Sequence, residues 1–123
     1  MYQVIKMYGD WEPWWFLEDW EDDITEMFEF DDFEEALHYF QKEWDIERNS
    51  LPCFQSKANL LATFWDPKDQ RWCEECDEDL QQYHSILLLK DGEELPKEYH
   101  LPAFNQKNKI PEMPSSCSLN LKM

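Results

Sequence analysis

Glycine is nearly absent from this 123-residue chain, which contains only Gly9 and Gly92. Glycine-rich loops that cradle phosphate groups need several closely spaced glycines, so the sequence excludes nucleotide-binding folds of that kind. No serine or cysteine stands in a recognisable nucleophile elbow either. The motifs therefore indicate no reaction, and we expect a non-enzymatic protein.

Basic residues are also scarce, with 11 Lys and Arg against 28 Asp and Glu and a net charge of −17. Residues 1 to 50 hold 16 acidic side chains, with Lys6, Lys42 and Arg48 as their fixed cations. Proteins bind nucleic acids chiefly through Lys and Arg contacts to phosphates. The composition argues against direct, unaided DNA binding and indicates either an acidic surface that aids solubility or a basic partner.

Long apolar runs are missing as well. No stretch approaches the roughly 20 residues that a membrane span requires, and Lys6 and Asp10 interrupt the start before a run of signal length develops. The cysteines are Cys53, Cys73, Cys76 and Cys117. They are too few and too irregularly spaced for a disulfide framework. We expect a cytoplasmic protein with no membrane contact and reduced thiols.

Aromatic residues are abundant, at 16% of the chain, and they concentrate between residues 10 and 20. The rings there are Trp11, Trp14, Trp15, Phe16 and Trp20, interleaved with Asp10, Glu12, Glu18 and Asp19. So much apolar area must be covered, either by the protein's own core or by a partner. Ring faces bordered by carboxylates suit Arg or Lys side chains of a partner, through cation–π and charge-assisted contacts.

The first third of the chain predicts two strands and a helix. Residues 2–8 are rich in β-formers, and Trp14 to Leu17 predicts a second strand that begins after Pro13 and could pair with the first in a hairpin. The carboxylate-rich residues 18–32 predict no regular element. Apolar residues recur at helical spacing at Phe33, Ala36, Leu37, Phe40 and Trp44. This stripe predicts a helix over residues 32–48, capped by Asp31 or Asp32.

Three further strands are predicted over 58–65, 71–76 and 82–90, paired consecutively as a meander. A helix beginning at Leu80 is the alternative to the third strand.

Prolines and a polar run after Leu95 prevent long elements, so we expect a single domain over 1–98 and a Pro-rich, weakly ordered tail over 99–123. The predicted fold is α+β, an antiparallel sheet of about five strands with helix 32–48 packed on one face. The segment 11–20 would complete the core and one rim.

The string Cys73-Glu-Glu-Cys76 is half of a zinc site. A tetrahedral site needs two more ligands, and the available side chains are Cys53, His38, His84, His100 and Cys117. Because no second ligand pair forms a motif, the two cysteines can equally flank a turn without metal. We expect no cofactor, and a zinc site of Cys73, Cys76 and His84 is the alternative.

Several tryptophan-rich strings are similar to those of a known family. They are Met1-Tyr-Gln-Val-Ile, Met7-Tyr-Gly-Asp-Trp-Glu-Pro-Trp-Trp-Phe-Leu-Glu, Phe64-Trp-Asp, Arg71-Trp-Cys-Glu-Glu-Cys-Asp and Leu80-Gln-Gln-Tyr-His-Ser. Through them, residues 1 to about 100 resemble the bacterial family catalogued as Domain of Unknown Function 1033. The resemblance implies a small cytosolic protein of Gram-positive bacteria with no established activity, from a family in which many members are described as DNA-binding.

Three hypotheses for the function follow. The first is an adaptor whose acidic, tryptophan-rich surface engages a basic protein, one that itself handles DNA, so that carboxylates stand in for phosphates. Its expected binding residues are Glu12, Trp14, Trp15, Glu18, Asp19, Glu21, Asp22 and Asp23. The second is a DNA-binding or regulatory module with zinc held by Cys73, Cys76 and His84 or Cys53. The third is an enzyme in which carboxylates among the tryptophans form a catalytic pocket.

Overall fold

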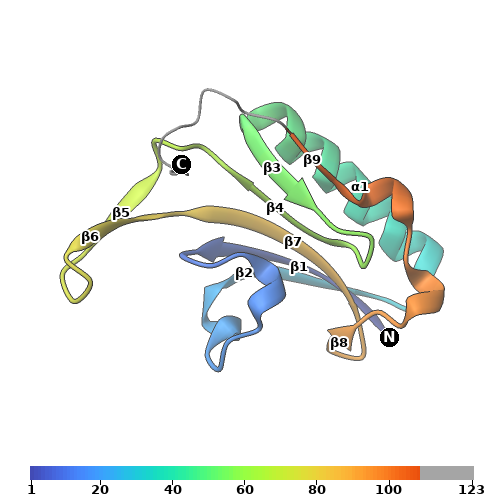
Figure 1. The fold of residues 1–123 in the computed structure, drawn as a ribbon. Coiled ribbons are helices and arrows are strands. Elements are labelled where there is room, and N and C mark those ends of the chain that lie inside the picture. The colour runs from blue at the N-terminus through green and yellow to red at the C-terminus, as the bar shows by residue number, and fades with distance from the viewer. Residues whose placement is uncertain (109–123) are drawn as a thin grey trace.

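One long helix packs across an antiparallel sheet in the computed structural model, which describes residues 1–108 (Figure 1). The seven strands of the sheet are β1 (Tyr2–Gly9), β2 (Ile24–Phe30), β3 (Cys53–Ser56), β4 (Leu61–Trp65), β7 (Tyr83–Lys90), β8 (Glu93–Glu94) and β9 (Gln106–Lys107). Their order is β2-β1-β7-β4-β3-β9, and β8 pairs with β7. The α+β class is confirmed, with seven strands rather than about five.

Two further strands, β5 (Gln70–Cys73) and β6 (Glu78–Gln81), form a separate two-stranded ribbon. The predicted meander is therefore wrong, because β4 pairs directly with β7 and the ribbon is inserted between them. The prediction of a strand over 82–90 is confirmed by β7, and the alternative helix from Leu80 is wrong. The observed strand β4 covers residues 61–65 and is shorter than the predicted strand 58–65. Strand β3 was not predicted, because it has only four residues and directly follows Pro52.

The helix α1 (Phe33–Ser50) confirms the firmest prediction and runs two residues further. Asp32 caps its start, since the side chain accepts a hydrogen bond of 3.2 Å from the backbone N–H of Glu35. Arg48 lies in the last turn, where a cation complements the helix dipole. Ala36 and Phe40 are fully buried, so the predicted apolar stripe faces the sheet.

The sheet is buried on both faces. On the helix side the core contains Val4, Phe64, Ile86 and Leu88 from the sheet and Phe40 from α1. On the other side it contains Ile5, Met7, Leu61, Leu87 and Leu89. Trp14, Phe16, Trp20 and Ile24 pack against this second cluster. The aromatic segment therefore covers the face that the helix leaves open, as expected for a segment that completes the core.

The segment itself is not a strand, in contrast to the prediction for residues 14–17. It contains two short 3-10 helices, η1 (Pro13–Trp15) and η2 (Trp20–Asp23). Pro13 has a backbone angle preset for a helical turn, and Phe16 turns the chain with a left-handed φ of 45°. The place beside β1 is taken by β2, which was predicted to be irregular. The carboxylates of β2 obscured its pattern because both of its faces are largely exposed at the sheet edge.

The predicted tail does not begin at residue 99. Two 3-10 helices, η3 (Lys97–Tyr99) and η4 (Pro102–Phe104), lead into β9, which pairs with β3. The Phe104 ring lies 5.6 Å from the Phe40 ring, and the Tyr99 hydroxyl lies 2.9 Å from that of Tyr2. Prolines prevent long elements here but not packing. The rest of the predicted tail, residues 109–123, lies outside the described residues.

Over residues 1–108, no helix has the length and apolar character needed to cross a membrane.

Candidate binding pocket

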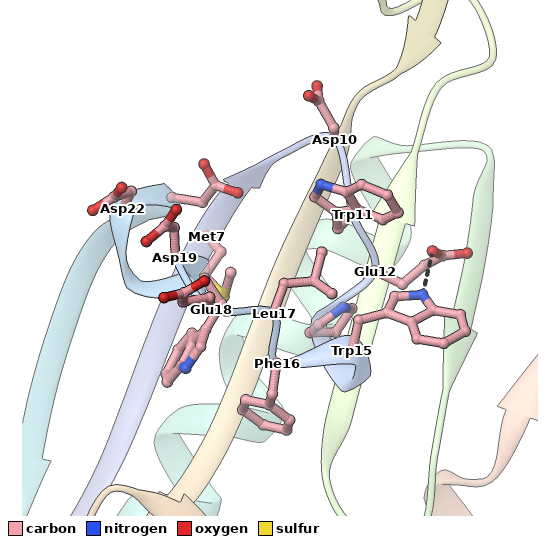
Figure 2. A pocket seen from close by; sticks show the side chains of 13 residues that line it. Met7, Asp10, Trp11, Glu12, Trp15, Phe16, Leu17, Glu18, Asp19 and Asp22 are labelled. Atoms are coloured by element: carbon pink, nitrogen blue, oxygen red, sulfur yellow. Dashed lines mark hydrogen bonds between the residues drawn. The ribbon is translucent and has the colours of Figure 1, made fainter. Parts of the chain in front are cut away.

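A pocket of about 390 Å³ opens between the end of β1 and the start of β2 (Figure 2). Its wall is formed almost entirely by the chain that connects these two strands. The acidic residues that line it are Asp10, Glu12, Glu18, Asp19, Asp22 and Asp23, and the aromatic ones are Trp11, Trp15, Phe16 and Trp20. Met7 lines it from β1. No Lys or Arg is among the described residues that line this pocket.

The rings of the segment divide into two groups. Phe16 and Trp20 pack edge to face, with centroids 5.1 Å apart, and both contact the sheet. Trp11 and Trp15 are instead 55% and 57% exposed. The indole N–H of Trp15 donates a 3.0 Å hydrogen bond to the carboxylate of Glu12, drawn dashed in Figure 2. Two large rings are thus available at the pocket, and one of them is held in place by an acidic neighbour.

Trp14 lies outside the pocket lining. Its ring packs toward the sheet, and the ammonium group of Lys57 lies 4.2 Å from the ring centroid. This is an internal cation–π contact of the kind that a partner could make with a neighbouring indole.

The carboxylates are not equivalent. Asp10 forms an ion pair with Arg71 and accepts a 2.6 Å hydrogen bond from the side-chain amide of Gln82. The pKa of Asp23 is raised, first by burial and then by the charges of Asp10 and Asp22, while Arg71 opposes the shift. Glu18, Asp19 and Asp22 are exposed. The pocket therefore holds an excess of negative charge, which Arg71 offsets in part by pairing with Asp10 and by acting on Asp23.

Gly9 explains how Asp23 fits so close to the end of β1. A Cβ atom at Gly9 would lie 2.4 Å from Oδ2 of Asp23 and 2.6 Å from its Cγ. Only glycine allows the carboxylate to pack directly against the strand. Sequence reasoning did not assign this role to Gly9.

Six of the eight predicted partner-binding residues line this pocket: Glu12, Trp15, Glu18, Asp19, Asp22 and Asp23. Trp14 and Glu21 do not. The lining residues absent from that prediction include Asp10 and Trp11, which adjoin the predicted set in sequence. Met7 lies three residues before Asp10, at the end of β1, and was not predicted because a strand methionine gives no binding signal of its own.

The residues of the predicted zinc site are not assembled. Cys73 ends β5 and Cys76 lies in the turn that leads to β6, whereas Cys53 is buried on β3. His84 is on β7, where its ring lies 4.7 Å from that of Tyr8 and its Nε2 is 3.8 Å from an Asp69 oxygen. Within residues 1–108, no three His, Cys, Asp or Glu side chains are placed to hold one metal ion.

The two thiols of the turn contact each other. The backbone N–H of Cys76 donates a 3.2 Å hydrogen bond to Sγ of Cys73. A side-chain hydrogen bond to Cys73, followed by desolvation and the negative charge of Cys73, raises the pKa of Cys76 to about 11. A free, strongly nucleophilic thiolate at Cys76 is therefore not favoured at neutral pH.

Comparison with known proteins gives one match. A family model described as "Protein of unknown function (DUF1033)" matches residues 1–119. No curated protein and no solved structure matches the chain.

Proposed function

The chain belongs to this DUF1033 family, and we propose that it is a non-enzymatic binding protein whose acidic pocket takes Arg or Lys side chains of a basic protein partner. The observation that carries the proposal is the combination of six carboxylates and two exposed indoles around one pocket without a lining cation. Guanidinium and ammonium groups are attracted by both parts of such a site. An anionic ligand would be repelled.

The exposure of Trp11 and Trp15 supports this proposal. Each ring leaves more than half of its surface open although the rest of the segment packs on the sheet. A cation above such a ring gains about 0.5–1 kcal/mol at an exposed site. The hydrogen bond between Trp15 and Glu12 places a carboxylate beside the ring, where both can contact the same guanidinium.

We further propose that the partner is a protein that handles DNA, with the carboxylates taking the place of phosphates. The net charge of −17 and the concentration of acids around the pocket support mimicry of a polyanion. The alternative is direct DNA binding, for which Lys and Arg are too few and too dispersed over the chain. Localisation in the cytoplasm belongs to the same proposal.

Titration with a synthetic arginine-rich peptide tests the pocket. Calorimetry should give one binding event that weakens steeply with added salt, since the contacts are charged. Replacing Trp15 with alanine should weaken binding about two- to fivefold, in line with the loss of one exposed cation–π contact. Glu12→Gln should also weaken binding, because glutamine still accepts the indole hydrogen bond but lacks the charge.

Matched controls distinguish the pocket from the acidic surface in general. Trp72 is 53% exposed but lies on the β5–β6 ribbon, so Trp72→Ala should leave the affinity unchanged. Glu93→Gln and Glu94→Gln remove exposed charges on β8, outside the pocket lining, and should have little effect. Equal losses from the controls, or binding that ignores salt, would contradict the proposal.

A displacement assay tests the mimicry. Fluorescent duplex DNA bound to the same arginine-rich peptide should be released by the chain and released less by the Trp15→Ala variant. If the chain binds the free duplex instead, the DNA-binding alternative is favoured and mimicry is rejected.

A further inference from the structure

The β5–β6 ribbon projects from one end of the sheet, and its turn carries Cys73 and Cys76 (Figure 1). The base of the ribbon is fixed to the body. Arg71 pairs with Asp10 at the end of β1, and the side-chain amide of Gln81 donates to the carbonyl oxygens of Asp66 and Asp69 at 2.7 and 3.0 Å. The turn itself is exposed. The two cysteines therefore lie at the outer end of a ribbon whose base is anchored to the body of the protein.

The turn has the geometry that two metal-binding cysteines need. The backbone N–H of Asp77 donates to the carbonyl oxygen of Cys73 at 2.8 Å, and Asp77 adopts a left-handed φ of 56°. This folds Cys76 back toward Cys73, so that its backbone N–H reaches the Cys73 sulfur at 3.2 Å. This hydrogen bond holds the Cys73 side chain against the backbone of Cys76, so the two cysteines stand close together at one end of the ribbon.

Arg71 places a positive charge near the two cysteines. It lies two residues before Cys73 on β5, on the same side of the strand, and it interacts electrostatically with both sulfurs. Glu74 and Glu75, which lie between the two cysteines, add negative charge that attracts a cation to the turn.

Two thiolates are half of the ligand set of a structural zinc ion, which takes four at about 2.3 Å in a tetrahedron. The described residues provide no third ligand to this pair. Cys53, the other cysteine among them, is 2% exposed on β3. The remaining pair must come from elsewhere, and the β5–β6 ribbon projects beyond the rest of the sheet, where a second molecule can reach its turn (Figure 1).

We infer that the β5–β6 turn is one half of a four-cysteine zinc site, completed by Cys73 and Cys76 of a second copy of the chain. A two-fold arrangement brings two identical half-sites together and closes the assembly at a dimer. Each turn also brings exposed carboxylates at 74, 75 and 77–79, which repel those of the other copy. Because of this repulsion, dimerisation requires the metal and is strengthened by salt.

Zinc titration of the reduced, metal-free full-length chain tests the site. Calorimetry should show saturation at about one zinc ion per two chains, and sedimentation should show that the mass doubles over the same range. Cys73→Ser and Cys76→Ser should each abolish both effects, whereas Cys117→Ser serves as the matched control and should abolish neither. Circular dichroism of the serine variants checks that the fold is intact.

Three results would overturn the inference: no zinc uptake, uptake of one ion per chain without a change in mass, or loss of the site in Cys117→Ser. The outcome is independent of the proposed function. Cys73→Ser should bind the arginine-rich peptide normally, and Trp15→Ala should dimerise normally with zinc. Added salt also distinguishes the proposed function from the zinc inference, since salt should weaken peptide binding but strengthen the zinc dimer.

Discussion

Replacing Gly9 with alanine should destabilise the protein through a clash with one side chain, that of Asp23. The new Cβ would lie 2.4 Å from an Asp23 oxygen, which is closer than real Cβ atoms approach. Crowding of this kind typically costs about 1–3 kcal/mol. Because Gly9 does not have a left-handed φ, alanine fits its backbone conformation. By itself this change would stabilise the protein by about 0.4–1 kcal/mol, since alanine lowers the conformational entropy of the unfolded chain. The net loss should lie between about 0 and 2.6 kcal/mol.

The clash can be isolated with a second variant. In an Asp23→Ala background the carboxylate is gone, so Gly9→Ala should become neutral or stabilising. Urea unfolding at neutral pH, followed by tryptophan fluorescence, gives the four free energies of this double-mutant cycle. The expected coupling is about 1–3 kcal/mol, the size of the clash itself. Equal effects of Gly9→Ala in both backgrounds would refute the packing of Asp23 against β1.

Three further variants test the charge distribution and the core. Asp23→Asn should raise the melting temperature at neutral pH, because the raised pKa of Asp23 means that its charge is disfavoured in the folded state, and the gain should shrink as the pH falls through that pKa. A gain that persists in acid would contradict this. Asp32→Ala removes the cap of α1 and should cost about 1 kcal/mol in urea unfolding, whereas the neighbouring Asp31→Ala should cost little. Phe40→Ala should cost about 3–5 kcal/mol, since the ring is fully buried between α1 and the sheet; a loss below 1 kcal/mol would contradict that position.

The parts of the fold that sequence could predict are those in which one periodicity dominates. The stripe through Ala36 and Phe40 has a helical period and a capping residue, so α1 was found almost to its ends. The strands β1 and β7 are apolar on both sides because both sheet faces are covered, which distinguishes them from surface elements.

Other parts depend on partners that are distant in the chain. Residues 24–30 form a strand because β1 offers a free edge, and their exposed glutamates give no period that would reveal it. The turn after Trp65 is compatible with a meander or with a separate ribbon, and the pairing of β4 with β7 selects the ribbon. Local pattern alone cannot choose between such pairings.

The candidate pocket was largely predictable because most of its wall comes from one continuous segment. Rings and carboxylates that adjoin in sequence remain adjacent around η1 and η2. The exposure of individual rings was not predictable, because Trp14 and Trp15 are neighbours of the same type with opposite roles. They are successive residues of η1, and successive side chains of a 3-10 helix point about a third of a turn apart.

The position of β7 in the sheet has a consequence for synthesis of the chain. Strand β1 pairs along its whole length with β7, from Tyr2 opposite Lys90 to Gly9 opposite Tyr83. Strand β1 leaves the ribosome well before β7 and cannot complete this pairing until β7 is made, and such long-range pairing forms slowly. During that interval the apolar side chains of β1 and the tryptophans that follow it are unprotected. The carboxylates interspersed among those tryptophans repel other nascent chains. They therefore protect the incompletely folded chain from aggregation until β1 and β7 have paired.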